Sequence, residues 1–311
     1  MNASAFRFGG RNLEVRYLEL PHTKHEVRAG QWQAQKPRGQ VVILPGRGDF
    51  LEKYTPLALF LNGAGYSVTS LDWLGQGASG RLGRHPQAGH IASYNDYVAT
   101  LRGCLESFDL TAQPMTWLAY SMGAPVALRA LLEHPYIASK LVLLSPMFGF
   151  AELPEPLTCT LSGAANALGL SERFAFGERP TDPTRWTFES SQVSSDPAAF
   201  AAFREVLVAR PHLLLGGSTW GWVKASLEAF RDLRRADLGA LELPTLLLSA
   251  QDERTVSVEA QREMARRLPN AEFVILPGKH DLLLSEQEVA EDLFKRMETF
   301  LAQNSDSGKS R

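Results

Sequence analysis

The sequence has few cysteines and no long apolar run, and each scarcity excludes a class of protein. Cys104 and Cys159 are the only two cysteines among 311 residues, and they form no C-x-x-C pair. A disulfide framework or a metal site such as zinc is therefore not expected, and a reducing compartment fits. No window has the roughly 18 consecutive apolar residues of a membrane span. The first ten residues lack the basic and apolar regions of a signal peptide.

The sequence also lacks an excess of either charge, since the formal net charge is −2 and no long basic run occurs. Nucleic acid is therefore not an expected partner. The hydrophobic share of 44% and the charged share of 21% are ordinary for a soluble globular protein. We expect a cytoplasmic protein, with peripheral contact at the inner face of the membrane as its closest association with lipid. The small polar residues at 304–311 predict a flexible tail.

What the chain does contain is an alternation of short apolar runs and amphipathic stretches. Residues 13–20 alternate apolar and polar positions, which predicts an antiparallel edge strand that 31–35 could pair with. Beyond it, strands and helices alternate, which predicts an α/β fold with a mostly parallel, doubly wound sheet. The expected strands are 41–44, 66–71, 115–119, 140–145, 245–249 and 272–276, and the expected helices are 54–62, 93–108, 124–133, 257–268 and 285–301.

The alternation breaks between residues 147 and 238, where several glycines and prolines accompany many aromatic residues. We interpret this segment as a helical lid inserted into a core made of 1–146 and 239–303. Its aromatic side chains could form the core of the lid, or its inner face could grip an acyl chain, and both can hold at once. Phe148, Trp186 and Trp220 are the candidate substrate contacts in the lid.

A single serine stands between the strand ending at 119 and the following helix, in the sequence Ala119-Tyr120-Ser121-Met122-Gly123. Small residues on both sides let the strand and the helix approach closely, which presents the serine hydroxyl on a strained turn. The motif is A-x-S-x-G rather than the usual G-x-S-x-G, so by itself it is a weak signal. Tyr120, next to this serine, is a further candidate substrate contact.

A serine nucleophile needs a base and an acid, and on a parallel sheet these collect beyond the carboxyl ends of strands. His280 follows the last strand in a loop beside a glycine. Asp252 follows the strand 245–249, with Glu253 one residue on as its competitor. The order Ser121, Asp252, His280 is the order of nucleophile, acid and base in α/β-hydrolases. The backbone N–H groups of Arg47 and Met122 are the candidate oxyanion donors.

Several segments resemble the α/β-hydrolases of the bacterial lysophospholipase and monoacylglycerol lipase group. The resemblance implies the same triad and oxyanion donors, with no cofactor or metal. One departure is Ala119, where the group mostly has glycine, and another is Asp49, where glutamate is usual. The segments are LPGRGDFLEKY at 44–54, DWLGQGASGR at 72–81, SYNDYV at 93–98, AYSMGA at 119–124, SAQDERTV at 249–256 and GKHDLLLSE at 278–286.

The sequence therefore predicts a serine hydrolase that acts on carboxylic esters, with lysophospholipids or monoacylglycerols as substrates. One alternative is an aminopeptidase of the proline iminopeptidase type, for which Glu152 and Glu155 could hold the substrate amine. Another, of a different class, is a non-catalytic binding protein with the same fold. Haloalkane dehalogenases and epoxide hydrolases are set aside, because they have aspartate at the position of Ser121.

Overall fold

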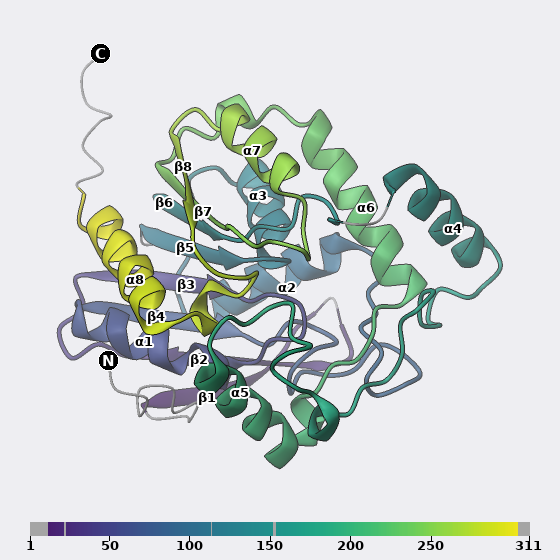
Figure 1. Ribbon diagram of the computed structural model, residues 1–311. Coiled ribbons are helices and arrows are strands. Elements are labelled where there is room, and N and C mark those ends of the chain that lie inside the picture. The colour runs from purple at the N-terminus through teal and green to yellow at the C-terminus, as the bar shows by residue number, and fades with distance from the viewer. Residues whose placement is uncertain (1–11, 22, 113, 152–153, 304–311) are drawn as a thin grey trace.

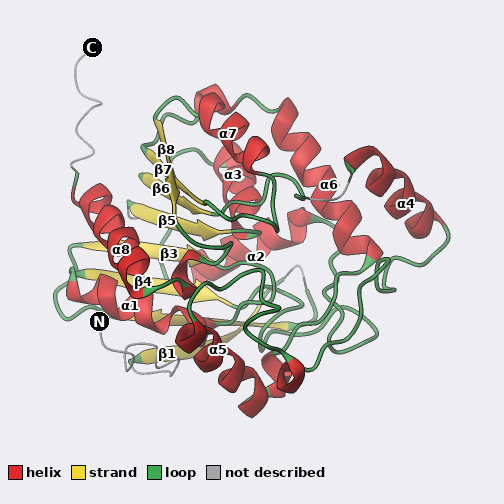
Figure 2. Ribbon diagram, viewed as in Figure 1, coloured by secondary structure: helices red, strands yellow, loops and turns green. Residues whose placement is uncertain are grey.

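The computed structural model describes residues 12–21, 23–112, 114–151 and 154–303, so the predicted tail at 304–311 lies outside the described residues (Figure 1). A central sheet is covered by helices on both faces (Figure 2). Its strands are β1 Leu13–Glu19, β2 Glu26–Trp32, β3 Gly39–Leu44, β4 Tyr66–Leu71, β5 Met115–Tyr120, β6 Lys140–Leu144, β7 Thr245–Ala250 and β8 Ala271–Leu276.

The sheet has eight strands in the order β1-β2-β4-β3-β5-β6-β7-β8. β1 and β2 are antiparallel at one edge, and all pairs from β4 to β8 are parallel. This arrangement confirms the predicted α/β fold. The register pairs Leu44 with Ala119 and Leu144 with Leu248, so the carboxyl ends of β3, β5, β6 and β7 lie side by side. Residues that follow these strands therefore meet at one edge of the sheet.

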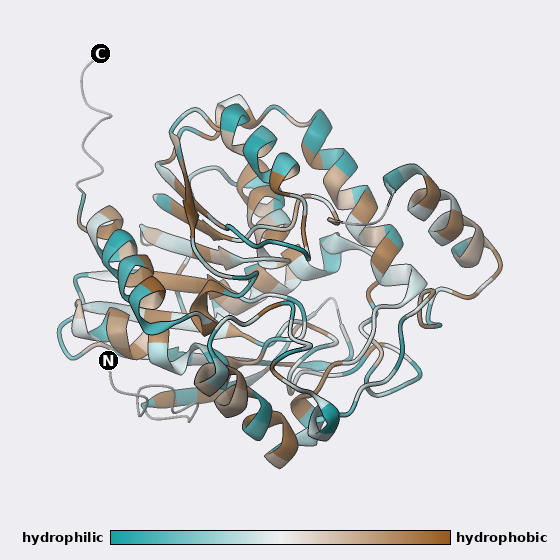
Figure 3. Ribbon diagram, viewed as in Figure 1, coloured by the Kyte–Doolittle hydropathy of each residue, from teal (hydrophilic) through white to brown (hydrophobic). Residues whose placement is uncertain are grey.

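The helices bury two separate apolar layers against the two faces of the sheet. α1 (Thr55–Gly63) and α8 (Gln287–Ala302) cover one face, where Leu61 and Met297 are fully buried. The layer on the other face includes residues of α2 (Tyr94–Ser107), α3 (Gly123–Glu133), α6 (Trp220–Arg235) and α7 (Val258–Arg267). In Figure 3 the central strands are mostly apolar while the helices carry polar residues on their outer sides, the pattern of a buried parallel sheet.

The α-helices that cover the sheet or follow its strands are α1 Thr55–Gly63, α2 Tyr94–Ser107, α3 Gly123–Glu133, α4 Glu155–Ala167, α5 Pro197–Ala209, α6 Trp220–Arg235, α7 Val258–Arg267 and α8 Gln287–Ala302. The short 3₁₀ helices are η2 Leu51–Tyr54, η3 Pro183–Arg185, η4 Pro211–Leu213, η5 Leu238–Ala240 and η6 Leu282–Leu284.

The chain between β6 and β7, residues 145–244, is here called the inserted segment. It contains α4, α5 and α6, which lie on the right and lower sides of Figure 1. Trp222 and Phe230 of α6 belong to the same buried cluster as α2 and α3, so α6 packs as a helix of the core layer. The division of the chain into a core and a lid at 147–238 stays a prediction.

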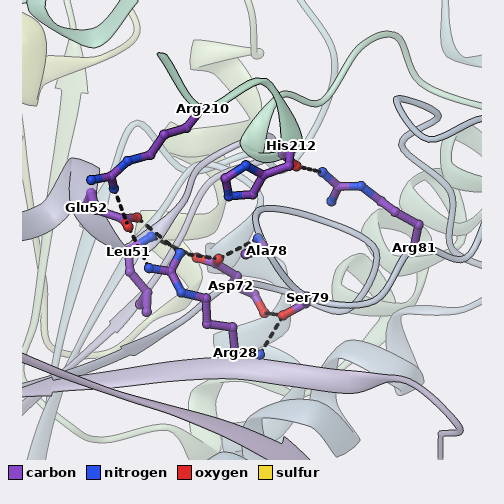
Figure 4. Close-up of polar contacts among 9 residues, drawn as sticks. All are labelled: Arg28, Leu51, Glu52, Asp72, Ala78, Ser79, Arg81, Arg210 and His212. Atoms are coloured by element: carbon purple, nitrogen blue, oxygen red, sulfur yellow. Dashed lines mark hydrogen bonds and ion pairs between the residues drawn. The ribbon is translucent and has the colours of Figure 1, made fainter. Parts of the chain in front are cut away.

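A buried polar network joins the core to the inserted segment (Figure 4). The guanidinium of Arg28 donates to Glu52 at 2.6 Å and to Asp72 at 3.1 Å. Arg210, from the inserted segment, donates to the same Glu52 at 2.9 Å. Asp72 also accepts from the backbone N–H of Leu51 at 2.8 Å. The network thereby ties the loops that follow β3 and β4 to the inserted segment.

Candidate active site

Ser121 lies on the turn between β5 and α3, in a backbone conformation that few L-residues adopt. Its φ is 48°. The N–H of Ser121 donates to the carbonyl of Leu144 at 2.9 Å, and its own carbonyl accepts from Ala124 at 3.0 Å. A residue held in this region costs about 1 to 3 kcal/mol, which the surrounding hydrogen bonds offset. The turn has the geometry that the sequence predicts for a nucleophile.

Two glycines make room for this turn. A Cβ atom on Gly123 would lie 2.2 Å from the carbonyl oxygen of Leu44, so α3 reaches β3 only because this position lacks a side chain. A Cβ atom on Gly46 would lie 2.6 Å from the ring of Tyr120. Both contacts are closer than real Cβ atoms approach. The loop after β3 and the serine turn are thus packed directly against each other.

His280 is brought to Ser121 by the loop that follows β8. Its Nε2 lies 3.0 Å from the Oγ of Ser121, and the residue is only 4% exposed. The loop is held by the inserted segment, because the N–H of Asp281 donates to the carbonyl of Val193 at 2.8 Å. Lys279 donates to the carbonyl of Ser191 at 2.7 Å. The predicted pairing of serine and histidine is therefore present.

The acid that contacts His280 is Glu253, which corrects the choice of Asp252. Glu253 Oε2 lies 2.7 Å from Nδ1 of His280, and the Glu253 side chain is fully buried. Its other oxygen accepts from the backbone N–H groups of Thr255 at 2.8 Å and Val256 at 3.2 Å. Asp252 is exposed, and its N–H is bound to the carbonyl of Gly278 at 3.0 Å.

The predicted acid, Asp252, and the carboxylate that contacts His280, Glu253, are one residue apart, and the reason is local. Adjacent side chains in this short loop leave the backbone in different directions, and the bond to Gly278 fixes Asp252 with its carboxylate toward solvent. The sequence contained both carboxylates, but no periodicity distinguishes them in a loop. In the structure, the side chain of Glu253 reaches His280 while its other oxygen accepts from the N–H groups of Thr255 and Val256.

The two candidate oxyanion donors belong to the serine turn and to the loop after β3 that packs against it. Met122 is the N-cap residue of α3, so its N–H points from the positive end of that helix. Within the described part of the chain, neither the Arg47 N–H nor the Met122 N–H donates a hydrogen bond. The neighbouring Gly48 N–H donates to Oε1 of Gln76 at 2.7 Å, which holds the loop after β3 in place. Two backbone donors thus remain available for an oxygen beside Ser121.

Ser121 and His280 line a cavity of about 610 Å³. Of the predicted substrate contacts, Tyr120, Trp186 and Trp220 line it. Phe148 does not, because its side chain is buried in the core layer at 1% exposure. The apolar lining that sequence reasoning did not single out includes Phe150, Leu157, Leu161, Phe203, Leu207 and Trp222.

The wall of the cavity contains a buried ion cluster that sequence reasoning also missed. Lys53 Nζ lies 2.7 Å from Asp49 and 2.6 Å from Asp281. Burial alone would lower the pKa of Lys53, but the carboxylates of Asp281 and Asp49 outweigh it and raise that pKa. Asp49 also accepts from the N–H of Gly46 at 3.0 Å. The cluster therefore links the loop before Arg47 to the residue after His280.

No group of three or more histidine, cysteine or carboxylate side chains among the described residues is placed to hold a metal ion. In that same part of the chain, no helix combines the length and the apolar character needed to cross a membrane.

Comparison with known proteins identifies the family. Residues 35–288 match the family described as "Serine aminopeptidase, S33". The chain belongs to this family. As a member of the S33 family, it is 28% identical over 306 residues to the probable lysophospholipase L2 of Haemophilus influenzae, covering 94% of this chain and 90% of that one. It is 32% identical to the lysophospholipase L2 of Escherichia coli K12, covering 74% and 68%.

Solved structures share the fold of this S33 family member. A soluble variant of monoglyceride lipase from Saccharomyces cerevisiae superposes with a TM-score of 0.73 at 16% identity, covering 94% of this chain and 97% of that one. A carboxyl esterase from Bacillus coagulans superposes with a TM-score of 0.71 at 14% identity, covering 94% and 98%. The chain is an α/β-hydrolase of the lysophospholipase and monoacylglycerol lipase group, and it is a serine hydrolase of the esterase type.

Proposed function

We propose that this protein hydrolyses carboxylic esters that carry a single acyl chain, with Ser121 as nucleophile, His280 as base and Glu253 as acid. The observation that supports it most is the unbroken hydrogen-bonded row from Glu253 through His280 to Ser121, with distances of 2.7 and 3.0 Å. This row ends at an apolar cavity of about 610 Å³. A serine hydroxyl becomes an effective nucleophile only with such a base and acid.

In the proposed reaction, Ser121 Oγ attacks the ester carbonyl carbon and its proton moves to Nε2 of His280. The negative charge on the carbonyl oxygen is stabilised by the N–H groups of Arg47 and Met122. The bond to the leaving alcohol then breaks, and His280 returns the proton to that alcohol. Water attacks the acyl-enzyme in the same way, which releases the fatty acid and restores Ser121. Glu253 keeps the imidazole oriented and stabilises its cationic form.

The cavity suits an amphiphile with one acyl chain. Leu157 and Leu161 of α4 line it while 56% and 46% exposed, and Phe176 lines it while 93% exposed. Exposed apolar side chains at the rim of a cavity favour contact with lipid. The proposal therefore includes peripheral contact with lipid through this rim. Two relatives are called lysophospholipases, which agrees with this substrate class.

The aminopeptidase alternative has less support. Glu155 forms an ion pair with Arg234 and does not line the cavity of Ser121. Glu152 lies outside the described residues. Glu178 does line the cavity, but it shares it with the cationic side chain of Arg47, which disfavours a free amine. A binding protein without catalytic activity would not need the row from Glu253 to Ser121.

The proposal is tested by labelling with a fluorophosphonate probe. Wild type should be labelled and S121A should not, since the probe reacts only with an activated serine. S145A is a matched control, because Ser145 follows the neighbouring strand β6 with a φ of 39° and is fully buried. It should be labelled as wild type. Equal labelling of S121A and wild type would refute the nucleophile, and turnover of aminoacyl-anilides but not of p-nitrophenyl esters would favour the peptidase.

A further inference from the structure

The side chain of Arg47 is a cation that enters the cavity with few partners. Its Nη2 donates to the carbonyl of Gly216 at 2.7 Å. Its Nε is shielded from solvent and has no hydrogen-bond partner. The guanidinium lies over the ring of Trp222, with Cζ 5.1 Å from the ring centroid. No carboxylate of the described residues lies within ion-pair distance of it. Gly89 also packs against the guanidinium, since a Cβ atom there would lie 2.3 Å from Nη2. Among the described residues, the polar and aromatic contacts of the Arg47 side chain are thus one carbonyl and one ring face.

This environment leaves the positive charge poorly compensated. Burial lowers the pKa of Arg47, and the charge of Glu178 opposes that shift only in part. Glu178 is exposed, and its Oε2 already accepts from the N–H of Ser218 at 2.8 Å. Arg28 is the contrasting case, since it is buried between the carboxylates of Glu52 and Asp72. Buried cations that lack such partners favour an anionic ligand.

The position of Arg47 indicates which anion would bind. Its backbone N–H is a candidate oxyanion donor, so its side chain starts at the ester that would react and extends along the cavity wall. In a lysophospholipid, the phosphate is separated from the acyl ester only by the glycerol carbons. A guanidinium is well suited to phosphate oxygens because its planar N–H groups can donate in pairs. A monoacylglycerol offers only a hydroxyl group at the same place.

We propose that the Arg47 guanidinium binds the phosphate of the substrate headgroup and makes the protein selective for lysophospholipids over monoacylglycerols. This inference rests on the proposed function, because it concerns the same cavity. It assigns different roles to two parts of one residue. The Arg47 N–H stabilises the oxyanion, and the Arg47 side chain selects the headgroup.

The test compares kcat/KM for 1-acyl-glycerophosphoethanolamine and for the 1-acylglycerol with the same acyl chain. The measured quantity is the ratio of the two values in wild type, R47M, R47K and R81M. R47M should lower the ratio by about 10- to 100-fold, the range expected for hydrogen bonds to a charged group. R47K, which keeps the charge but loses the paired geometry, should lie between R47M and wild type.

R81M is the matched control. Arg81 also donates to a carbonyl of the inserted segment, that of His212 at 2.7 Å, but it does not line the cavity. It should keep the wild-type ratio. If R47M lowers both rates equally and leaves the ratio unchanged, Arg47 only holds the inserted segment and the inference is wrong. The inference is also wrong if inorganic phosphate inhibits wild type but not R47M while the two enzymes have the same ratio of kcat/KM values. The site then binds free anions and not the headgroup of the substrate.

Binding to S121A separates this inference from the proposed hydrolysis. Dissociation constants for the same two lipids should favour the lysophospholipid in S121A, and the preference should disappear in S121A/R47M. If wild type hydrolyses neither lipid while this preference is present, the proposed reaction is wrong and the headgroup site stands. Equal binding of both lipids by S121A would overturn the headgroup site even if wild type is an active esterase.

Discussion

Replacing Glu253 by glutamine tests whether Glu253 or Asp252 is the carboxylate that acts with His280. The Oε1 of Glu253 accepts from the N–H groups of Thr255 and Val256, at 2.8 and 3.2 Å. In E253Q these two donors hold the amide oxygen at that place, since an amide NH₂ group cannot accept from them. The NH₂ group then faces Nδ1 of His280, where Oε2 lies at 2.7 Å in the wild type.

The consequence is a change of tautomer. When the amide donates to Nδ1, that nitrogen carries no proton, so the imidazole proton moves to Nε2. Nε2 lies 3.0 Å from Oγ of Ser121 and can then no longer accept the serine proton. In a serine protease, the corresponding change of acid to amide lowers kcat about 10⁴-fold. We expect a similar loss here, equivalent to about 5.5 kcal/mol of activation free energy.

The assay is kcat/KM for p-nitrophenyl butyrate, with thermal unfolding to verify that each variant folds. D252N is the control, because Asp252 is exposed and, among the described residues, only its backbone N–H has a hydrogen-bond partner. Its activity should stay within about twofold of wild type, as expected for a surface substitution. A loss in D252N as large as in E253Q would refute the assignment, and so would an E253Q enzyme of nearly full activity.

Two further predictions concern stability. K53M should lower the free energy of unfolding by about 3 to 5 kcal/mol in urea titrations, because it leaves Asp49 and Asp281 buried without their cation. K224M is the control, since Lys224 forms an exposed pair with Glu228, and it should lower that free energy by less than about 1 kcal/mol. Equal losses in the two variants would contradict this reasoning. Burial, opposed by Arg28, raises the pKa of Asp72 from 3.8 to about 6, so the folded state binds its proton more tightly than the unfolded state. Wild type should therefore lose up to about 3 kcal/mol relative to D72N between pH 4 and pH 7, and a pH-independent difference would show that Asp72 does not titrate in this range.

The sequence was sufficient for the elements whose pattern depends on burial over several residues. The strand predicted at 66–71 matches β4, and the one at 245–249 matches β7 except for its last residue. In β7 the positions 246–248 are continuously apolar, as is typical of strands covered on both faces. Ser121 and His280 were also found, since each follows a strand of the sheet. The loops and the inserted segment were harder to predict from the sequence. Nothing in the pattern distinguished Asp252 from Glu253.

Phe148 shows the same limit from another side. An aromatic residue in a segment without periodicity can belong to a cavity wall or to the core, and the composition of the segment is the same in both cases. The structure buries Phe148 in the core layer and lines the cavity with Phe150 instead. The ion cluster around Lys53 was not predicted, because Asp281 is far from Lys53 in the sequence and the sheet topology alone brings them together.

In the proposed reaction, the hydrogen bonds between the inserted segment and the loop of His280 would connect substrate entry to proton transfer. Ser191 and Val193 accept from Lys279 and Asp281, the two residues on either side of His280, and Val193 also lines the cavity. An acyl chain that presses against Val193 therefore acts on the backbone that holds the imidazole. Under the proposed function, binding energy gained far from the ester would be available to orient His280, and a truncated substrate would lose turnover as well as affinity. Exchange of inserted segments between relatives would alter catalysis unless residues 191–193 were kept.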